Sequence, residues 1–157
     1  MRAAPSSPDP VSASPPVRPC VRLLSAIALA AWEAPQNVAG AALFAALMAS
    51  GRVQRTTRRE GRLSVRAAGL GVSLGWFIFW SPTPGTDPEW MWRHERGHGV
   101  QSRLLGPLYL PLVGLPSVSR VLYGIGYRAV RGRPWTRYYA GYPEAWADRA
   151  GGVHDRD

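Results

Sequence analysis

The sequence predicts a mainly α-helical protein with a small β element, in which a helix carrying two histidines packs against a short downstream helix. Three observations predict this fold. Residues 87–107 (DPEWMWRHERGHGVQSRLLGP) and 143–152 (PEAWADRAGG) both carry helix start and stop signals, and residues 21–50 are largely apolar. With 157 residues the chain can bury one modest core, so we expect one small domain.

Composition divides the chain into three parts. Residues 1–19 are rich in Pro and Ser without apolar periodicity, which predicts a disordered tail. Residues 20–50 form an apolar segment that we expect to associate with a membrane as an N-terminal helical element. Residues 51–157 then form the small domain that contains the histidines.

The apolar segment consists of two stretches, residues 21–31 and 38–49, separated by the hexapeptide WEAPQN. Neither stretch reaches the about 20 residues that a spanning helix needs. Together they predict one helix kinked at Pro35 or a shallow helical hairpin with WEAPQN at its tip. A cleaved signal peptide is a third interpretation. We favour membrane association over a soluble core.

The charge balance favours a lipid partner over a nucleic acid. All 19 basic residues are arginine, and the net charge is +9. The arginines are spread along the chain and no nucleic-acid motif is present, so we expect no nucleic-acid partner and favour anionic membrane lipid. The single cysteine, Cys20, excludes an intramolecular disulfide and a cysteine metal cluster.

The middle of the chain combines a basic patch with a β-prone segment. Residues 51–62 (GRVQRTTRREGR) predict a solvated arginine-rich loop or a basic flank that contacts lipid. Residues 62–80 contain β-branched and aromatic residues punctuated by glycines, which predicts two short strands or an interfacial segment. A strand edge beside the histidine helix would have a use, since such an edge can bind an extended peptide.

The histidine helix has clear boundaries, whereas the next segment does not. Asp87 is the expected N-cap, Pro88 begins the first turn, and Gly106-Pro107 end the helix. Residues 108–118 are apolar but interrupted by prolines and a glycine, so we expect them to be extended or re-entrant. We then expect a helix over about 118–130, an arginine-rich loop, and a last helix with Pro143 at its first position and Gly151 at its end.

The pentapeptide HERGH (94–98) predicts a metal site on the first of these helices. A spacing of four residues puts His94 and His98 on one helix face, where both imidazoles can reach one tetrahedral ion. Glu95 then lies beside the open coordination position as a candidate general base. Zn²⁺ is the metal expected for such a site. The alternative is a chance meeting of polar residues on a solvated face.

The last helix offers a third ligand and a residue to orient a histidine. Glu144 is the candidate ligand, and Asp148 lies on the same helical face four residues later, where it can accept a hydrogen bond from a ligating imidazole. The alternatives are a glutamate that complements the helix dipole and a surface aspartate paired with an arginine. Tyr138, Tyr139, Tyr142 and His154 are nearby candidate donors for transition-state stabilisation, with ordinary packing as their alternative.

HERGH followed by EAWADRAGG resembles the gluzincin metalloproteases, whose pattern is HExxH and then a Glu with an Asp four residues on. It is most similar to the integral-membrane group that includes the CaaX-box endopeptidases and the bacterial heat-shock membrane proteases, where the second motif reads ExxAD. The resemblance implies that His94, His98 and Glu144 are zinc ligands, that Glu95 is the base, that Asp148 orients a ligand, and that residues 51–157 form a small zincin-like domain.

HERGHGVQSRLLGPLYLPLVGLPS is also similar to a small family of bacterial membrane proteins with HExGH, a QSxxLGPLYL continuation and a late ExWAD. This likeness covers most of residues 75–152 and implies a bacterial cytoplasmic membrane protein. We therefore predict a membrane-associated zinc hydrolase, a metallopeptidase that acts on a peptide or protein substrate. The alternative is a non-catalytic membrane protein in which a structural or vestigial metal site recruits a partner.

Overall fold

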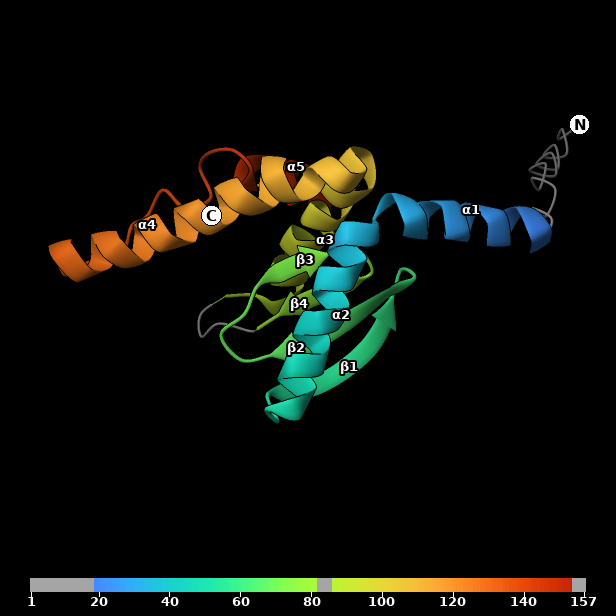
Figure 1. Cartoon of the computed structure of the whole chain (residues 1–157). Helices are drawn as coiled ribbons and strands as arrows, with labels where there is room; N and C mark the ends of the chain where they lie inside the picture. Colours follow the sequence, from blue (N-terminus) through green and yellow to red (C-terminus); the bar gives the residue numbers. More distant parts are fainter. Residues whose placement is uncertain (1–18, 82–85, 154–157) are drawn as a thin grey trace, which may run out of the picture.

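The computed structural model describes residues 19–81 and 86–153, in which helices α2 (Ala34–Ala49) and α3 (Pro88–Leu105) flank one small sheet and two further helices extend away from it (Figure 1). The predicted class, mainly α-helical with a small β element, is confirmed. The predicted tail lies outside the described residues except for Pro19. The other helices are α1 (Pro19–Trp32), η1 (Gly106–Leu108), η2 (Leu110–Gly114), α4 (Leu115–Arg131) and α5 (Glu144–Gly151).

The sheet contains four strands in the order β1-β2-β4-β3. They are β1 (Val53–Arg59), β2 (Arg62–Ala67), β3 (Val72–Leu74) and β4 (Phe77–Trp80). β1 and β2 are antiparallel, β2 and β4 are parallel, and β4 and β3 are antiparallel. The prediction of a loop over 51–62 was wrong, and 62–80 hold three strands rather than two. β1 forms because pairing with β2 satisfies the backbone groups on one side of it, while most of its side chains stay exposed at the edge of the sheet.

The two faces of the sheet differ in chemistry because side chains alternate along each strand. Val65 and Phe79 lie on the face that packs against Leu47 of α2. The opposite face includes Ser73 and Arg62, which bond to α3 through the backbone oxygens of Glu95 and Gly99. The apolar face therefore forms the core, and the polar face holds the histidine helix in place.

Helix α2 covers the apolar face at close range. A Cβ atom on Gly40 would lie only 2.6 Å from the Phe77 ring, so the glycine allows the helix to approach the sheet. Half of the predicted membrane segment is thus engaged with the sheet. Among the described residues no helix is long and apolar enough to cross a membrane, so the predicted N-terminal membrane segment is not supported by the fold.

The hexapeptide WEAPQN is a joint rather than an exposed tip. Glu33 separates α1 from α2 and is fully buried, as is Gln36. The Ser102 hydroxyl donates to Glu33, Gln36 Nε2 donates to the Gly106 carbonyl, and the Trp32 indole donates to the Arg103 carbonyl at 2.9 Å. The joint therefore satisfies polar groups at the C-terminal end of α3 that lack partners within that helix.

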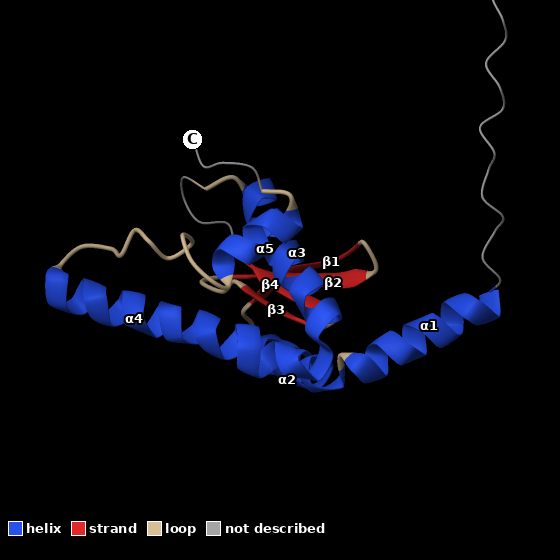
Figure 2. Cartoon of the chain, turned by 90° about the horizontal axis from the view of Figure 1, so that it is seen from above, coloured by secondary structure: helices blue, strands red, loops and turns tan. Residues whose placement is uncertain are grey.

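The chain stays helical after α3, so the prediction that residues 108–118 are extended was wrong, whereas the re-entrant alternative stays a prediction. The three prolines at 107, 111 and 116 each fall in the first turn of η1, η2 or α4. Proline is tolerated there because its missing N–H would have no intrahelical acceptor. α4 consequently begins earlier than predicted, and it runs away from the body in the direction opposite to α1 (Figures 1 and 2).

Candidate metal centre

Helix α3 presents two histidines on one buried face. As predicted, Asp87 caps the helix by accepting a hydrogen bond from the backbone N–H of Glu89 at 3.0 Å, and Pro88 lies in the first turn. His94 and His98 are only 3% and 5% exposed. The two histidines and Glu95 of HERGH therefore belong to the interior, which excludes the solvated-face interpretation for these three residues.

Helix α5 packs directly against α3 because glycines stand at the contact. A Cβ on Gly97 would lie 1.9 Å from the Ala147 carbonyl oxygen, and a Cβ on Gly151 would lie 2.0 Å from the Arg93 carbonyl oxygen. Only residues without a side chain fit these two positions. The close approach puts Glu144, three residues before Ala147, opposite the histidines.

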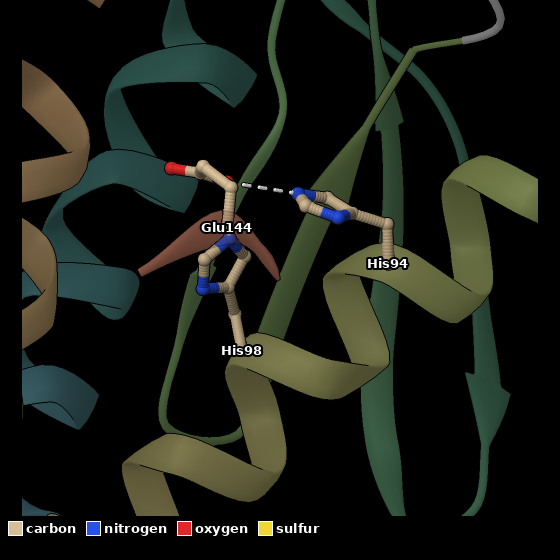
Figure 3. Close-up of side chains that lie close together, drawn as sticks. All are labelled: His94, His98 and Glu144. Carbon is tan, nitrogen blue, oxygen red and sulfur yellow. Dashed lines mark hydrogen bonds and ion pairs between the residues drawn. The ribbon is translucent and has the colours of Figure 1, made fainter. Parts of the chain in front are cut away.

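The three predicted ligands converge. Glu144 Oε2 lies 3.1 Å from His94 Nε2 and 3.1 Å from His98 Nε2, and the three ligand atoms are within 4.8 Å of one another (Figure 3). Ligand atoms about 2.0–2.1 Å from a tetrahedral ion are themselves about 3.3 Å apart. The donor set and its spacing therefore fit a metal ion: His94, His98 and Glu144 form a buried group that could hold one.

The far nitrogen of each imidazole is engaged by its own partner. Asp148 Oδ1 lies 2.7 Å from His94 Nδ1, as predicted, and Gln101 Oε1 lies 2.8 Å from His98 Nδ1. A proton on each Nδ1 leaves the Nε2 lone pairs facing the shared position. Gln101 also donates from Nε2 to the Pro143 carbonyl at 3.1 Å, so it joins His98 to the start of α5.

The charged forms of His94 and Glu144 stabilise each other. Burial lowers the pKa of His94, but hydrogen bonds to Asp148 and Glu144 outweigh it and raise this pKa to about 9. Burial alone would raise the pKa of Glu144, but hydrogen bonds from the two histidines keep it well below its usual range. Ser117 donates to the other oxygen of Glu144, Oε1, at 2.6 Å. A proton on His94 thus occupies the position that a cation would take.

Glu95 is a further buried ionisable group beside the three converging ligands and is not one of them. Its carboxylate lines the same cavity as the two histidines. The Ser73 hydroxyl lies 2.9 Å from Glu95 Oε2 and 2.6 Å from its backbone oxygen, and a Cβ on Gly71 would lie 2.8 Å from Oε1. Burial raises the pKa of Glu95. The carboxylate is therefore held in place and favours the protonated state more than an exposed glutamate does.

A cavity of about 890 Å³ opens beside these groups. Its wall is largely apolar, with polar atoms near the histidines; apolar members include Leu70, Val72, Met91, Leu110, Leu115 and Val118. Tyr138 and Tyr139 also line it. Tyr142 does not, because its hydroxyl donates to the Leu112 carbonyl at 2.5 Å. His154 lies outside the described residues.

An edge of the sheet borders the cavity. Among the strands that the structure describes, β3 pairs only with β4, and its three residues all line the cavity wall. The carbonyl of Ser73, at the centre of β3, accepts a hydrogen bond from the Tyr109 hydroxyl at 2.9 Å. The strand edge expected beside the histidine helix is thus present, although one of its carbonyls already has a partner.

Sequence reasoning missed three residues of the site. Gln101 follows His98 by three residues on the same helix, so helical spacing could have indicated it. Ser117 and Ser73 come from other elements, and no local pattern connects them to the motif. Their roles depend on how α4 and β3 pack around α3.

The chain matches no protein-family model, no curated protein and no solved structure. The resemblance to gluzincins and to the bacterial membrane family therefore stays a prediction that rests on the two motifs.

Proposed function

We propose that the chain is a membrane-associated zinc-dependent hydrolase, a metallopeptidase in which Glu95 is the general base. The observation that carries this proposal is the place of Glu95. A closed structural metal site needs no acidic residue besides its ligands. Here a buried carboxylate faces the same cavity as the two histidines and is held there by Ser73.

The three ligands and Glu95 would have different roles in the reaction. His94, His98 and Glu144 would hold the ion, which supplies Lewis-acid activation of water and polarisation of a carbonyl group. Glu95 would take a proton from the attacking water and later deliver it to the departing amine. The raised pKa of Glu95 suits this exchange, because an upward shift brings the pKa of a carboxylate nearer to neutral pH, where it can both accept and return a proton.

The cavity supports a peptide as substrate. An extended peptide can form backbone hydrogen bonds with a strand edge, and β3 presents such an edge beside the candidate ligands. Tyr138 and Tyr139 line the same cavity and are candidate donors to the developing oxyanion. The apolar wall favours substrates with apolar side chains near the cleaved bond.

The test compares three forms of the full chain, loaded with zinc and assayed on a fluorogenic peptide library. Glu95→Gln should keep one zinc per chain while hydrolysis falls by about 100-fold or more, because this residue is a base and not a ligand. His98→Ala should lose both zinc and activity. Unchanged turnover in Glu95→Gln would defeat the mechanism, and loss of zinc in that variant would indicate a structural role for the carboxylate.

We also propose that the chain associates with anionic lipid, with the bacterial cytoplasmic membrane as its location. The support is chemical: α1 exposes Leu23, Leu24 and Ile27 and contains no acidic residue. Recovery of the full chain in the soluble fraction without detergent would contradict this part and leave the hydrolase untouched.

A further inference from the structure

Helix α4 carries an apolar face that no described part of the chain covers. Leu115, Val118, Leu122 and Ile125 recur at spacings of three and four residues and therefore share one side of the helix. Their side chains are 64%, 53%, 62% and 62% exposed. Four large aliphatic residues in a row with this exposure form a contiguous patch of the kind that marks an interaction site.

The other side of α4 is covered by the chain that returns from it. The Trp135 ring packs edge-on against Tyr123, with 4.8 Å between centroids, and the Arg120 guanidinium lies 4.8 Å from the Trp135 ring centre. Arg120 Nε also donates to the Tyr138 carbonyl at 2.9 Å. The returning segment thus packs on the arginine and tyrosine side and leaves the aliphatic side outward.

Helix α1 continues the apolar surface on the other side of the body. Leu23, Leu24 and Ile27 are more than half exposed. At the end of α1 the Trp32 ring fits against Gly106, where a Cβ would lie 2.2 Å from the ring, so α1 adjoins the segment that leads into α4. Both views show α1 and α4 extending in opposite directions from this junction along the same side of the molecule (Figures 1 and 2).

The charges around this surface are of one sign. α4 and the segment that returns from it, residues 115–143, contain five arginines and no aspartate or glutamate, and α1 also lacks acidic residues. A second copy docked on the same face would bring two sets of arginines together without a counter-charge. An anionic lipid surface supplies both the apolar layer and the negative charge.

We propose that α4 and α1 form one docking surface that lies flat on an anionic phospholipid bilayer, with the aliphatic side of α4 inserted among the lipid chains. The proposal deepens the membrane association proposed above and is independent of hydrolysis. It assigns α4, which the sequence pattern did not connect with the membrane, a direct part of the contact. Leu115 and Val118 also line the metal cavity, so the cavity wall adjoins the docked surface.

The test places a single environment-sensitive fluorophore on the full chain in a Cys20→Ser background. The labelled positions are Leu122→Cys on α4, Ile27→Cys on α1, and Thr56→Cys on β1 as the matched exposed control. Vesicles of phosphatidylcholine with phosphatidylserine should shift the emission of the first two labels to the blue, and lipids with quenching groups on their chains should quench both. The Thr56 label should not respond, and vesicles of phosphatidylcholine alone should give a weaker response.

A second variant measures the contribution of α4. Leu122→Glu with Ile125→Glu should weaken partitioning into the anionic vesicles at least tenfold while zinc content stays stoichiometric, which shows that the fold is retained. A response at Ile27 without one at Leu122 would overturn the role of α4 and leave α1 as the anchor. A blue shift at Leu122 that appears without vesicles and grows with protein concentration would overturn it too, because it would identify a second copy as the occupant.

Discussion

The contact between α3 and α5 gives the sharpest prediction, through the substitution Gly97→Ala. The new Cβ would lie 1.9 Å from the Ala147 carbonyl oxygen. Carbon and oxygen in close contact are about 3.3 Å apart, so the two helices must separate by about 1.4 Å. Metal sites tolerate about 0.2 Å in ligand distance. Glu144 is carried by α5, and this shift therefore withdraws it from the two histidines.

We expect the variant to bind zinc at least about 100-fold more weakly, because the carboxylate can no longer reach the position that both imidazoles share. The metal-free protein should lose up to about 2 kcal/mol: overpacking costs about 1–3 kcal/mol, and the better helix propensity of alanine returns about 1. Zinc competition against a chromophoric chelator measures the first quantity, and chemical unfolding of the metal-free protein measures the second.

Gly126→Ala is the matched control, because a Cβ there meets no neighbouring atom within 4 Å in the described structure. This variant should bind zinc normally and gain up to about 1 kcal/mol from helix propensity. If Gly97→Ala binds zinc as tightly as the control, the glycine contact does not position the ligand and the reasoning fails.

Three further results are expected. Gln101→Leu and Asp148→Ala should each weaken zinc binding by about 10–100-fold, because each releases the imidazole that the residue orients. Gln101→Glu keeps an acceptor for His98 and should recover part of the loss. Equal zinc affinity in the Gln101→Leu and Gln101→Glu variants would refute this role. Because the pKa of His94 is raised to about 9, zinc must displace the His94 proton, so zinc affinity should fall about tenfold per pH unit from pH 9 to pH 7. Calorimetry in buffers of different ionisation enthalpy should detect the released proton. Zinc binding without proton release at pH 7.5 would contradict this prediction. The raised pKa of His94 stabilises the metal-free fold fully below the ordinary histidine pKa of 6.5, and this contribution is lost by about pH 9. The lowered pKa of Glu144 stabilises the fold above the ordinary glutamate pKa of 4.5. The melting temperature of the metal-free protein should therefore be highest between pH 4.5 and 6.5, and a maximum at pH 8 would contradict the assignment.

The sequence was most informative where the chemistry is local. Asp87, Pro88 and the four-residue spacing of His94 and His98 lie within one helix, and helix geometry alone predicts their arrangement. In the second helix the same spacing rule places Asp148 on the face of Glu144. The ligand group of the structure is the predicted one, and Asp148 contacts the predicted kind of partner.

The errors arose where distant contacts decide the local structure. The two apolar stretches of residues 21–49 have similar composition, yet one packs on the sheet and the other lies exposed. β1 was mistaken for a loop because its many arginines concealed a strand whose backbone pairs with β2. The prolines after α3 suggested a break, but each one falls in a first turn where helix geometry accepts it.

The joint at Trp32, Glu33 and Gln36, of which Glu33 and Gln36 are fully buried, connects α1 to the rest of the fold through side-chain hydrogen bonds. Here the helix that follows the joint forms the core, and the joint itself completes the end of the helix that carries both histidines. Truncation that reaches past α1 would strip α2 from the sheet. The N-terminal helix α2 and the candidate metal centre therefore fold together and would be lost together.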